Sequence, residues 1–205
     1  DMVVLTHSDD DHLVGLMGVL EHYRVSHVLE SGYGEGHVYR DWLTEMEERK
    51  IDWIIVRAGQ QIDLGEGICL EVIYPRDDIL EGTESKANSN SVVLRLVWKK
   101  VSFLFTGDVD DDAERSILYG GVLCPLRCTV LKVAHHGSGG STCSEFVAAV
   151  DPQLAVIPVG EGNTFGHPSN ETLSRLNGVE VYRTDECGTI TFSTDGERLW
   201  VKTAR

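Results

Sequence analysis

The chain has 205 residues, of which 41% are hydrophobic and 25% are charged, a composition typical of one globular domain with a sizeable core. Acidic residues outnumber basic ones by 33 to 18, and the formal net charge of −15 argues against avid, nonspecific binding to nucleic acid. No stretch approaches the run of about 18 apolar residues that a membrane helix requires. We therefore expect a single domain over residues 1–205 that makes no membrane contact by itself.

Strands and helices alternate along most of the chain. Val3–Thr6 predicts a strand, and the apolar residues from Leu13 to Leu20 then recur at helical spacing. Further strands are predicted at 26–31, 51–59, 68–75, 91–98, 101–108, 129–134, 154–159, 179–183, 188–193 and 198–202, and further helices at 39–46, 110–119, 144–150 and 169–176. The polar segment Asp77–Asn90 predicts a long loop. The closing strands turn antiparallel, so the pattern indicates an α/β fold with mixed sheets.

The five cysteines are an odd number at irregular spacing, which favours reduced thiols over a disulfide framework. They are Cys69, Cys124, Cys128, Cys143 and Cys187. The segment "CPLRC" lacks a second pair of metal-binding residues nearby, so we expect its two cysteines to pack as small apolar side chains.

Polar clusters follow four of the predicted strands. Carboxyl ends of strands at one edge of an α/β sheet converge, and ligands bind there in such folds. The clustered residues are His7, Asp9, Asp11, His12, Asp108, His135, His136 and His167. Imidazoles and carboxylates together are ligands of first-row metals, and an acidic cluster this dense repels itself without a cation. The pattern therefore predicts a metal site.

Each cluster taken alone also has a plain structural interpretation. Asp9 and Asp10 are ordinary residues for the start of a helix, and Asp108 suits a tight turn. His167 stands before Pro168 and a predicted helix, where it could belong to a capping loop.

Six segments in their order along the chain resemble the metallo-β-lactamase superfamily, and more narrowly the hydrolase domain of the ComEC family of DNA-uptake proteins. They are "THSDDDH", "NSNSVVLRL", "LFTGD", "LKVAHHGS", "GHPS" and "YRTDECGTI". The resemblance implies an αββα four-layer sandwich with mixed sheets. Family members carry several strands before the first metal loop, whereas here Asp1 opens directly onto a strand, so we expect an N-terminally incomplete domain that exposes apolar surface.

The resemblance also implies a set of metal ligands. The superfamily signature H-x-H-x-D-H corresponds to His7, Asp9, Asp11 and His12, with Asp9 in place of the middle histidine, as in the ComEC-like branch. Asp108 corresponds to the carboxylate that bridges two metals. Of the two adjacent histidines, His135 is favoured as the later ligand, which leaves His136 to face the substrate.

Two asparagines mark a departure from the family. Asn88 or Asn90 stands where a further histidine ligand is expected, which implies a weakly held second metal. We expect one or two divalent ions, zinc or manganese, and the carboxylate of Asp9 shifts the preference toward manganese.

By resemblance, the chain is a metal-dependent hydrolase whose nucleophile is a metal-bound hydroxide, most similar to a phosphodiesterase or nuclease. Asp11 would orient the nucleophile or take its proton, and His136 with His167 would stabilise the oxyanion or protonate the leaving group. The expected substrate is DNA, or alternatively a small phosphodiester or nucleotide. A degenerate docking module is the second class of function. We expect a cytoplasmic location, or an extracytoplasmic one within a ComEC-like membrane protein.

Overall fold

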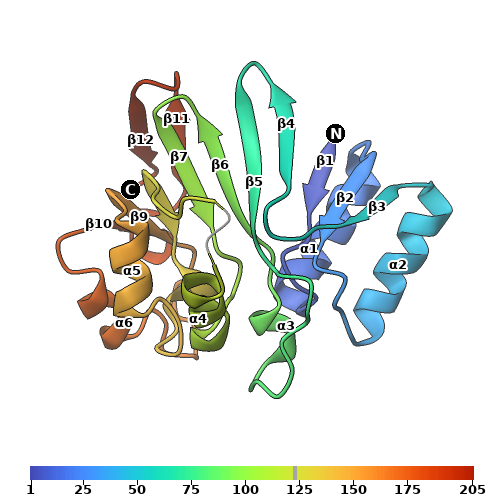
Figure 1. Cartoon of the computed structure of the whole chain (residues 1–205), viewed down its shortest axis with the longest axis horizontal. Helices are drawn as coiled ribbons and strands as arrows, with labels where there is room; N and C mark the ends of the chain where they lie inside the picture. The colour runs from blue at the N-terminus through green and yellow to red at the C-terminus, as the bar shows by residue number, and fades with distance from the viewer. Residues whose placement is uncertain (122–123) are drawn as a thin grey trace.

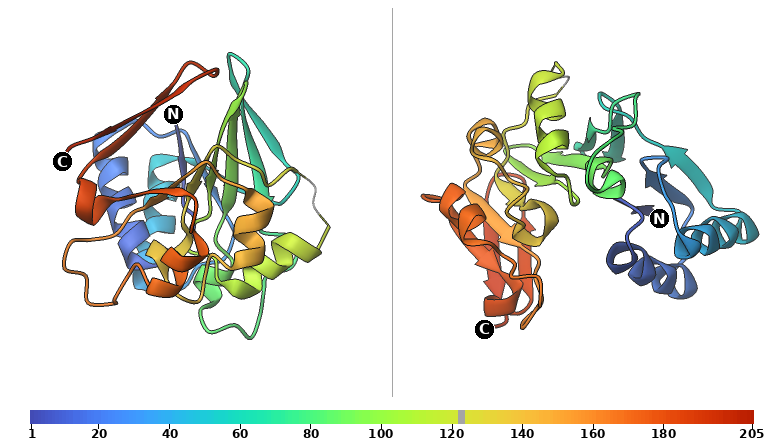
Figure 2. Two further views of the ribbon diagram at one scale, coloured as in Figure 1. Left: turned by 90° about the vertical axis from the view of Figure 1, so that its left-hand side faces the viewer. Right: turned by 90° about the horizontal axis from the view of Figure 1, so that it is seen from below.

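Two β-sheets pack face to face and carry helices on their outer surfaces, as the computed structural model of residues 1–121 and 124–205 shows (Figure 1). In Figure 1, α2 lies at the right-hand edge, whereas α4 and α5 lie toward the left. Viewed from below, the blue N-terminal part and the orange C-terminal part occupy opposite sides of the molecule, with α3 between them (Figure 2). The predicted αββα order is thereby confirmed.

The first sheet has three parallel strands in the order β1-β2-β3. They are β1 (Met2–Val4), β2 (His27–Glu30) and β3 (Asp52–Ile55), connected by α1 (Asp10–His22) and α2 (His37–Arg49). Parallel neighbours need a crossover connection, and the two amphipathic helices supply it.

The second sheet has seven strands in the order β10-β9-β8-β7-β6-β5-β4 and is mixed, with parallel pairing from β7 to β10 and antiparallel pairing from β4 to β7. Its strands are β4 (Gln61–Gly65), β5 (Ile68–Tyr74), β6 (Val93–Trp98), β7 (Val101–Phe105), β8 (Val130–Lys132), β9 (Leu154–Ile157) and β10 (Glu180–Arg183). A separate hairpin consists of β11 (Ile190–Thr194) and β12 (Leu199–Thr203). The remaining helices are α3 (Lys86–Ser89), α4 (Asp111–Tyr119), α5 (Ser144–Val150), α6 (Asn170–Arg175), α7 (Thr184–Cys187) and the 3₁₀ turn η1 (Ala134–Gly137).

Alternating apolar side chains explain the layers. In β2, Val28 packs with Trp42 in the core beneath α1 and α2, whereas its neighbour Leu29 packs with Val72 in the core between the sheets. In β7, Leu104 faces a third core beneath α4 and α5. Adjacent strand residues point to opposite faces, so each sheet has apolar side chains on both sides.

Three elements differ from the sequence predictions. β4 was not expected, because within Gln61–Gly65 only Ile62 packs against a core and the other positions are exposed. The predicted loop Asp77–Asn90 contains the short helix α3, which Ser85 caps by accepting a hydrogen bond from the Asn88 amide. α7 occupies "TDEC", which is too short to show helical periodicity.

An apolar groove lies between the second sheet and the β11–β12 hairpin. Its volume is about 400 Å³, and its lining includes Leu96, Phe103 and Phe192. Phe105 in the same groove is 40% exposed. Among the residues described, no helix combines the length and apolar character needed to cross a bilayer.

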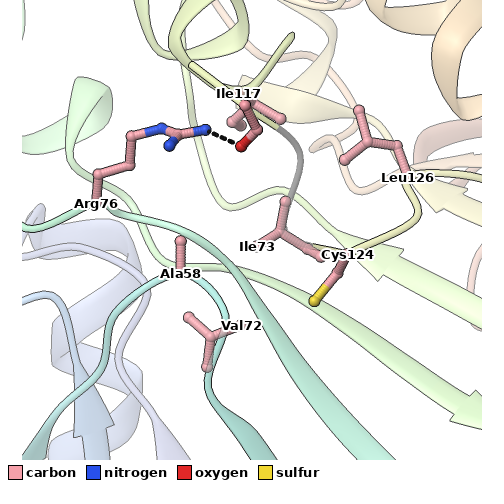
Figure 3. Close-up of a pocket in the computed structure, with 8 residues that line it drawn as sticks. Ala58, Val72, Ile73, Arg76, Ile117, Cys124 and Leu126 are labelled. Carbon is pink, nitrogen blue, oxygen red and sulfur yellow. Dashed lines mark hydrogen bonds between the residues drawn. The ribbon is translucent and has the colours of Figure 1, made fainter. Parts of the chain in front are cut away.

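Cys124 and Cys128 are buried in the core beneath α4 and α5, and all five cysteines are free thiols. Cys124 also lines a small pocket with Val72 and Ile117, at whose rim the guanidinium of Arg76 donates a hydrogen bond to the Gly121 carbonyl at 2.8 Å (Figure 3). The pocket measures about 10 Å³, which is room for about one water molecule at most. This pocket is therefore a feature of packing rather than a ligand site.

Candidate metal centre

The carboxylate of Asp108 is the centre of the cluster that the strand ends bring together. Its Oδ2 atom lies 3.4 Å from His12 Nε2 and 3.3 Å from His136 Nε2. Asp108 follows β7, His12 follows β1, and His136 follows β8. Three segments far apart in the sequence thus meet at one cluster. Because β1 belongs to the first sheet and β7 and β8 belong to the second, the loops converge from two sheets rather than along the single sheet edge that was predicted.

Two overlapping groups in this cluster have the geometry of metal sites. His7, His12 and Asp108 form one, and Asp11, His12 and His136 form the other, with the ligand atoms of each group within 4.8 Å of one another. Such spacing suits a divalent ion in either group. Because His12 belongs to both groups and its Nε2 has one lone pair, His12 can serve only one ion at a time.

The first metal loop is shaped by the start of α1. Asp9 is the N-cap residue, but its side chain makes no capping hydrogen bond, and its Oδ2 lies 3.9 Å from His7 Nε2. The helix begins through backbone bonds from His12 and Leu13 to the Asp9 carbonyl. Asp9 therefore stands at the start of the helix, as the capping interpretation has it, but its carboxylate lies near His7 instead of capping the helix amides.

The adjacent histidines after β8 diverge because both have left-handed backbone angles, with φ of 47° at His135 and 52° at His136. His136 donates through Nδ1 to the Pro158 carbonyl at 2.7 Å, which turns Nε2 toward Asp11 and Asp108. The His135 ring instead lies 5.7 Å from the ring of His167. The geometry therefore favours His136 as the ligand, opposite to the assignment that the sequence favoured.

Lys132, which the sequence analysis did not single out, lies directly beneath Asp108. Its ammonium donates to the Gly107 carbonyl at 2.8 Å and lies 3.4 Å from Asp108 Oδ1. The signal for it was a lysine inside the largely apolar segment "TVLKVA". Gly107 has φ +54°, and a Cβ there would lie 2.8 Å from the Ser91 Cβ, so only glycine fits this turn.

Three histidine ring nitrogens indicate whether the cluster can bind a metal ion. The Nε2 atoms of His7, His12 and His136 are buried and have no hydrogen-bond partner within the described part of the chain. Buried polar atoms normally have partners, and an unpaired one is costly. The Nδ1 atoms of His7 and His12 both lie within hydrogen-bonding distance of Thr6 Oγ1, at 3.1 and 3.4 Å. This arrangement leaves the Nε2 lone pairs free for a divalent ion, so the donor set fits.

The ionisation of His7 and Asp108 agrees with that chemistry, whereas the hydrogen bond to Asp108 raises the pKa of His136, so a metal ion there would compete with a proton. Burial, together with the neighbouring His12, lowers the pKa of His7 to about 3, so its imidazole is neutral, as a ligand must be. Burial alone would raise the pKa of Asp108, but the imidazoles of His12 and His136 and the charge of Lys132 hold it well below its ordinary value. Burial, followed by the charges of Asp11 and Asp108, raises the pKa of Asp9. These like charges are what a cation would offset.

A cavity of about 180 Å³ opens beside the cluster. Its lining includes Asp11, His136, Asn163, Phe165 and His167. Burial, and then the neighbouring His135, lowers the pKa of His167. The predicted residue His167 therefore lies at the wall of the cavity rather than in either ligand group.

A family model described as the metallo-beta-lactamase superfamily matches residues 1–161 of the chain. The chain belongs to the metallo-β-lactamase superfamily. Its members are generally hydrolases that depend on divalent metals, which agrees with the two ligand groups.

Two curated relatives place the chain near the competence proteins of this superfamily. It is 28% identical over 207 residues to "ComE operon protein 3" of Bacillus subtilis (strain 168), covering 94% of this chain and 24% of that protein. It is 29% identical over 197 residues to "Competence protein ComA" of Neisseria gonorrhoeae, covering 94% of this chain and 25% of that protein. The chain thus spans about a quarter of the length of these relatives, and the predicted resemblance to the ComEC-like branch is confirmed.

A solved structure from Parabacteroides distasonis ATCC 8503, assigned as a metal-dependent hydrolase, shares the fold. The TM-score is 0.51 at 10% sequence identity, and the match covers 90% of this chain and 76% of the other. At this identity the likeness concerns the fold alone.

The structure separates the two asparagines at which this member of the superfamily departs from the ligand pattern. Asn90 uses its side chain within the preceding loop, accepting from the Leu80 amide and donating to the carbonyls of Leu80 and Lys86. Asn88 Oδ1 is buried and finds no partner among the described residues. Asn90 therefore has a structural role, and of the two only Asn88 retains a free oxygen.

Proposed function

We propose that the chain is a metal-dependent phosphodiesterase domain. The observation that carries this proposal is the set of three buried, unpaired Nε2 atoms of His7, His12 and His136 gathered around the Asp108 carboxylate. The contacts of the cluster leave these three Nε2 atoms without a hydrogen-bond partner among the described residues, whereas imidazole nitrogens and carboxylates together are ligands of divalent ions.

Six residues would hold one or two ions, namely His7, Asp9, Asp11, His12, Asp108 and His136. When bound, divalent ions would lower the pKa of a water molecule at the site, and their positive charge would offset the negative charge on the phosphoryl oxygens. The carboxylates make the set harder than an all-histidine set, which favours manganese relative to zinc.

The remaining polar groups would handle the proton and the substrate. Asp11 is exposed and lines the cavity, with Oδ2 3.4 Å from His136 Nε2, so its carboxylate can orient the attacking water or take its proton. His167 and His135 form the neighbouring wall. As a neutral imidazole, His167 can donate a hydrogen bond to the developing oxyanion.

The substrate we propose is a phosphodiester, with DNA favoured because both curated relatives carry competence or competence-operon names. The net charge of −15 opposes avid binding of long polyanions, so we expect contact with only a few nucleotides at a time. A small phosphodiester or nucleotide remains the alternative substrate.

The test is hydrolysis of bis(p-nitrophenyl) phosphate with added manganese or zinc. Asp108→Ala should lower kcat/KM by more than about a hundredfold, since losing even a residue that only supports a metal ligand costs about 10- to 100-fold. Asp11→Ala should lose metal as well as activity.

Asp10→Ala is the matched control, because Asp10 is exposed at the start of α1 and belongs to neither ligand group. It should keep both metal and turnover. Absence of turnover by the folded wild-type chain with any divalent ion would overturn the proposal and favour the non-catalytic docking module.

A further inference from the structure

We propose that the exposed ring of Phe165 is a platform on which an unpaired nucleobase stacks while its phosphodiester lies at the metal centre. This inference rests on the proposed phosphodiesterase function and names the feature of the substrate that the site recognises. It makes the domain selective for single-stranded nucleic acid or short oligonucleotides over double-stranded DNA.

Phe165 is conspicuous because it is an aromatic side chain that folding leaves in water. It is 81% exposed, the largest exposed fraction among the exposed large hydrophobic residues of the described chain. One side of the ring lies against His167, with centroids 6.0 Å apart and planes 18° from parallel. The rest of the ring borders the cavity that also contains Asp11 and His136.

The ring also continues a row of aromatic side chains that leads to the metal ligands. Next to His167 stands His135, with centroids 5.7 Å apart, and His136 follows at 6.3 Å from His135. His136 Nε2 is 3.3 Å from Asp108. A base stacked on Phe165 would therefore lie at the outer end of a row whose inner end is the reaction centre.

The loop that carries Phe165 is held in place by Asn163. The side-chain Nδ2 of Asn163 donates hydrogen bonds to the carbonyls of Gly160 and His167 at 3.2 and 2.7 Å. Its Oδ1 accepts a hydrogen bond from the backbone N–H of His167 at 3.1 Å. These bonds close the turn on both sides of Phe165. The ring is thus presented on a preorganised loop, which reduces the entropy cost of binding.

The charges around the cavity favour recognition of a base rather than of additional phosphates. Of the seven described residues that line the cavity, none is a lysine or arginine, and Asp11 is acidic. Stacking on an aromatic ring needs no positive charge and tolerates every base. The volume of about 180 Å³ lies below the roughly 300–1,000 Å³ of pockets for drug-sized ligands, so the cavity suits a single base rather than a base pair.

An unpaired base is required because both faces of a base are covered inside a duplex. Proteins that stack bases on aromatic side chains bind single strands, loops or ends. The preference for single strands therefore follows from the exposed ring itself.

The experiment compares a thymidine tetranucleotide with an abasic tetranucleotide of equal length and charge, on the manganese-loaded protein. Wild type should bind the thymidine oligonucleotide about tenfold more tightly by fluorescence anisotropy and show the same preference in KM. Phe165→Ala should lose this preference without changing the binding of the abasic oligonucleotide, and Phe165→Trp should keep it.

Tyr23→Ala is the matched control, because Tyr23 is 69% exposed but lies at the far end of α1, about 20 Å from the metal loop. It should leave both affinities unchanged. A thymidine preference that survives in Phe165→Ala, a wild type that binds both oligonucleotides equally, or equal binding of the thymidine strand paired in a duplex would each overturn the inference.

Failure of this inference can be distinguished from failure of the proposed function. If the wild type hydrolyses both oligonucleotides and Phe165→Ala changes nothing, the phosphodiesterase stands and the platform is wrong. If neither oligonucleotide is hydrolysed but anisotropy shows a base preference that Phe165→Ala removes, the platform stands and the catalytic proposal is wrong.

Discussion

His135 and His136 are chemically identical neighbours that backbone conformation directs to different places. Both residues have the left-handed backbone conformation, which is unusual for residues other than glycine. Their ring centroids lie 6.3 Å apart, and the ring planes are inclined at 70°. Such strained conformations cost on the order of 1–3 kcal/mol each and persist where surrounding contacts enforce them. Here the contact is the 2.7 Å hydrogen bond from His136 to the Pro158 carbonyl.

Substituting each histidine separately tests this divergence. His136→Ala should lower metal content and reduce turnover by more than about a hundredfold, because it removes a donor atom from the second ligand group. His135→Ala, its matched control, should keep the metal, because its ring contacts His167 instead. Metal content after dialysis measures both, and loss of metal from His135→Ala alone would contradict the assignment.

At the scale of elements, α4 holds the loop that follows the histidines. Glu114 on α4 is fully buried and accepts hydrogen bonds from the amides of Thr142 and Cys143 at 2.5 and 2.8 Å. Burial raises its pKa from 4.5 to about 7, although the two amide donors act to lower it. The carboxyl is therefore easier to protonate in the folded chain than in the unfolded one.

This shift predicts a pH dependence of stability. Because the pKa of Glu114 is higher in the folded chain than in the unfolded one, the protonated carboxyl stabilises the folded state. This stabilisation is complete below about pH 4.5 and is lost as the pH rises through about 7. The loss reaches about 3 kcal/mol of unfolding free energy. Urea unfolding of the metal-free protein from pH 5 to 8 measures it. Glu114→Gln should flatten the slope, and an equally steep slope in that variant would show that other groups cause it.

Gly137, the last residue of η1, lies close to the loop that carries His167, and its carbonyl accepts a hydrogen bond from the Ser169 amide at 2.9 Å. Gly137 has φ +83°, and a Cβ there would lie 2.6 Å from the Pro168 Cβ. Gly137→Ala should therefore destabilise the protein by about 1–3 kcal/mol and raise KM, because the loop with His167 must move. Thermal unfolding and steady-state kinetics measure the two effects.

Gly140→Ala is the control for this substitution. Gly140 belongs to the same glycine-rich segment, but the nearest atom to its Cβ position is 4.0 Å away. An effect of Gly140→Ala as large as that of Gly137→Ala would show that segment flexibility, not the contact with Pro168, is responsible.

For the whole molecule, metal binding should link the two halves of the sandwich. The ligands come from the loop after β1 in the first sheet and from the loops after β7 and β8 in the second. An ion that binds only when these loops are assembled stabilises the folded state against unfolding.

Thermal unfolding with and without metal tests this linkage. Manganese at about 100 times its Kd should add roughly 2.7 kcal/mol, which corresponds to a Tm increase of about 5–10 °C for a chain of this size. A chelator should reverse the increase, and Asp108→Asn should abolish it. An equal increase in Asp108→Asn would mean that the ion binds outside the proposed centre.

Much of the fold could be predicted because its signals are local. Polar clusters at the ends of apolar strands indicated that His7, Asp11, His12 and Asp108 gather at one site, and helical periodicity located α1 and α2. The sequence did not indicate that this site lies between two sheets rather than at one sheet edge. β4 escaped prediction because its residues form no apolar pattern, and pairing with β5 alone makes it a strand.

By itself, the sequence determined which kinds of donor atoms this protein carries and the order in which the chain presents them, because residue type and strand pattern need no partner. Only the tertiary structure decided that His136 rather than His135 faces Asp108, that Lys132 lies beneath that carboxylate, and that Phe165 stands exposed at the cavity. These outcomes depend on backbone angles and on contacts between segments far apart in the chain, such as Pro158 with His136 and Gly107 with Lys132. The physical reason is that side-chain direction is set by packing, which no local pattern encodes.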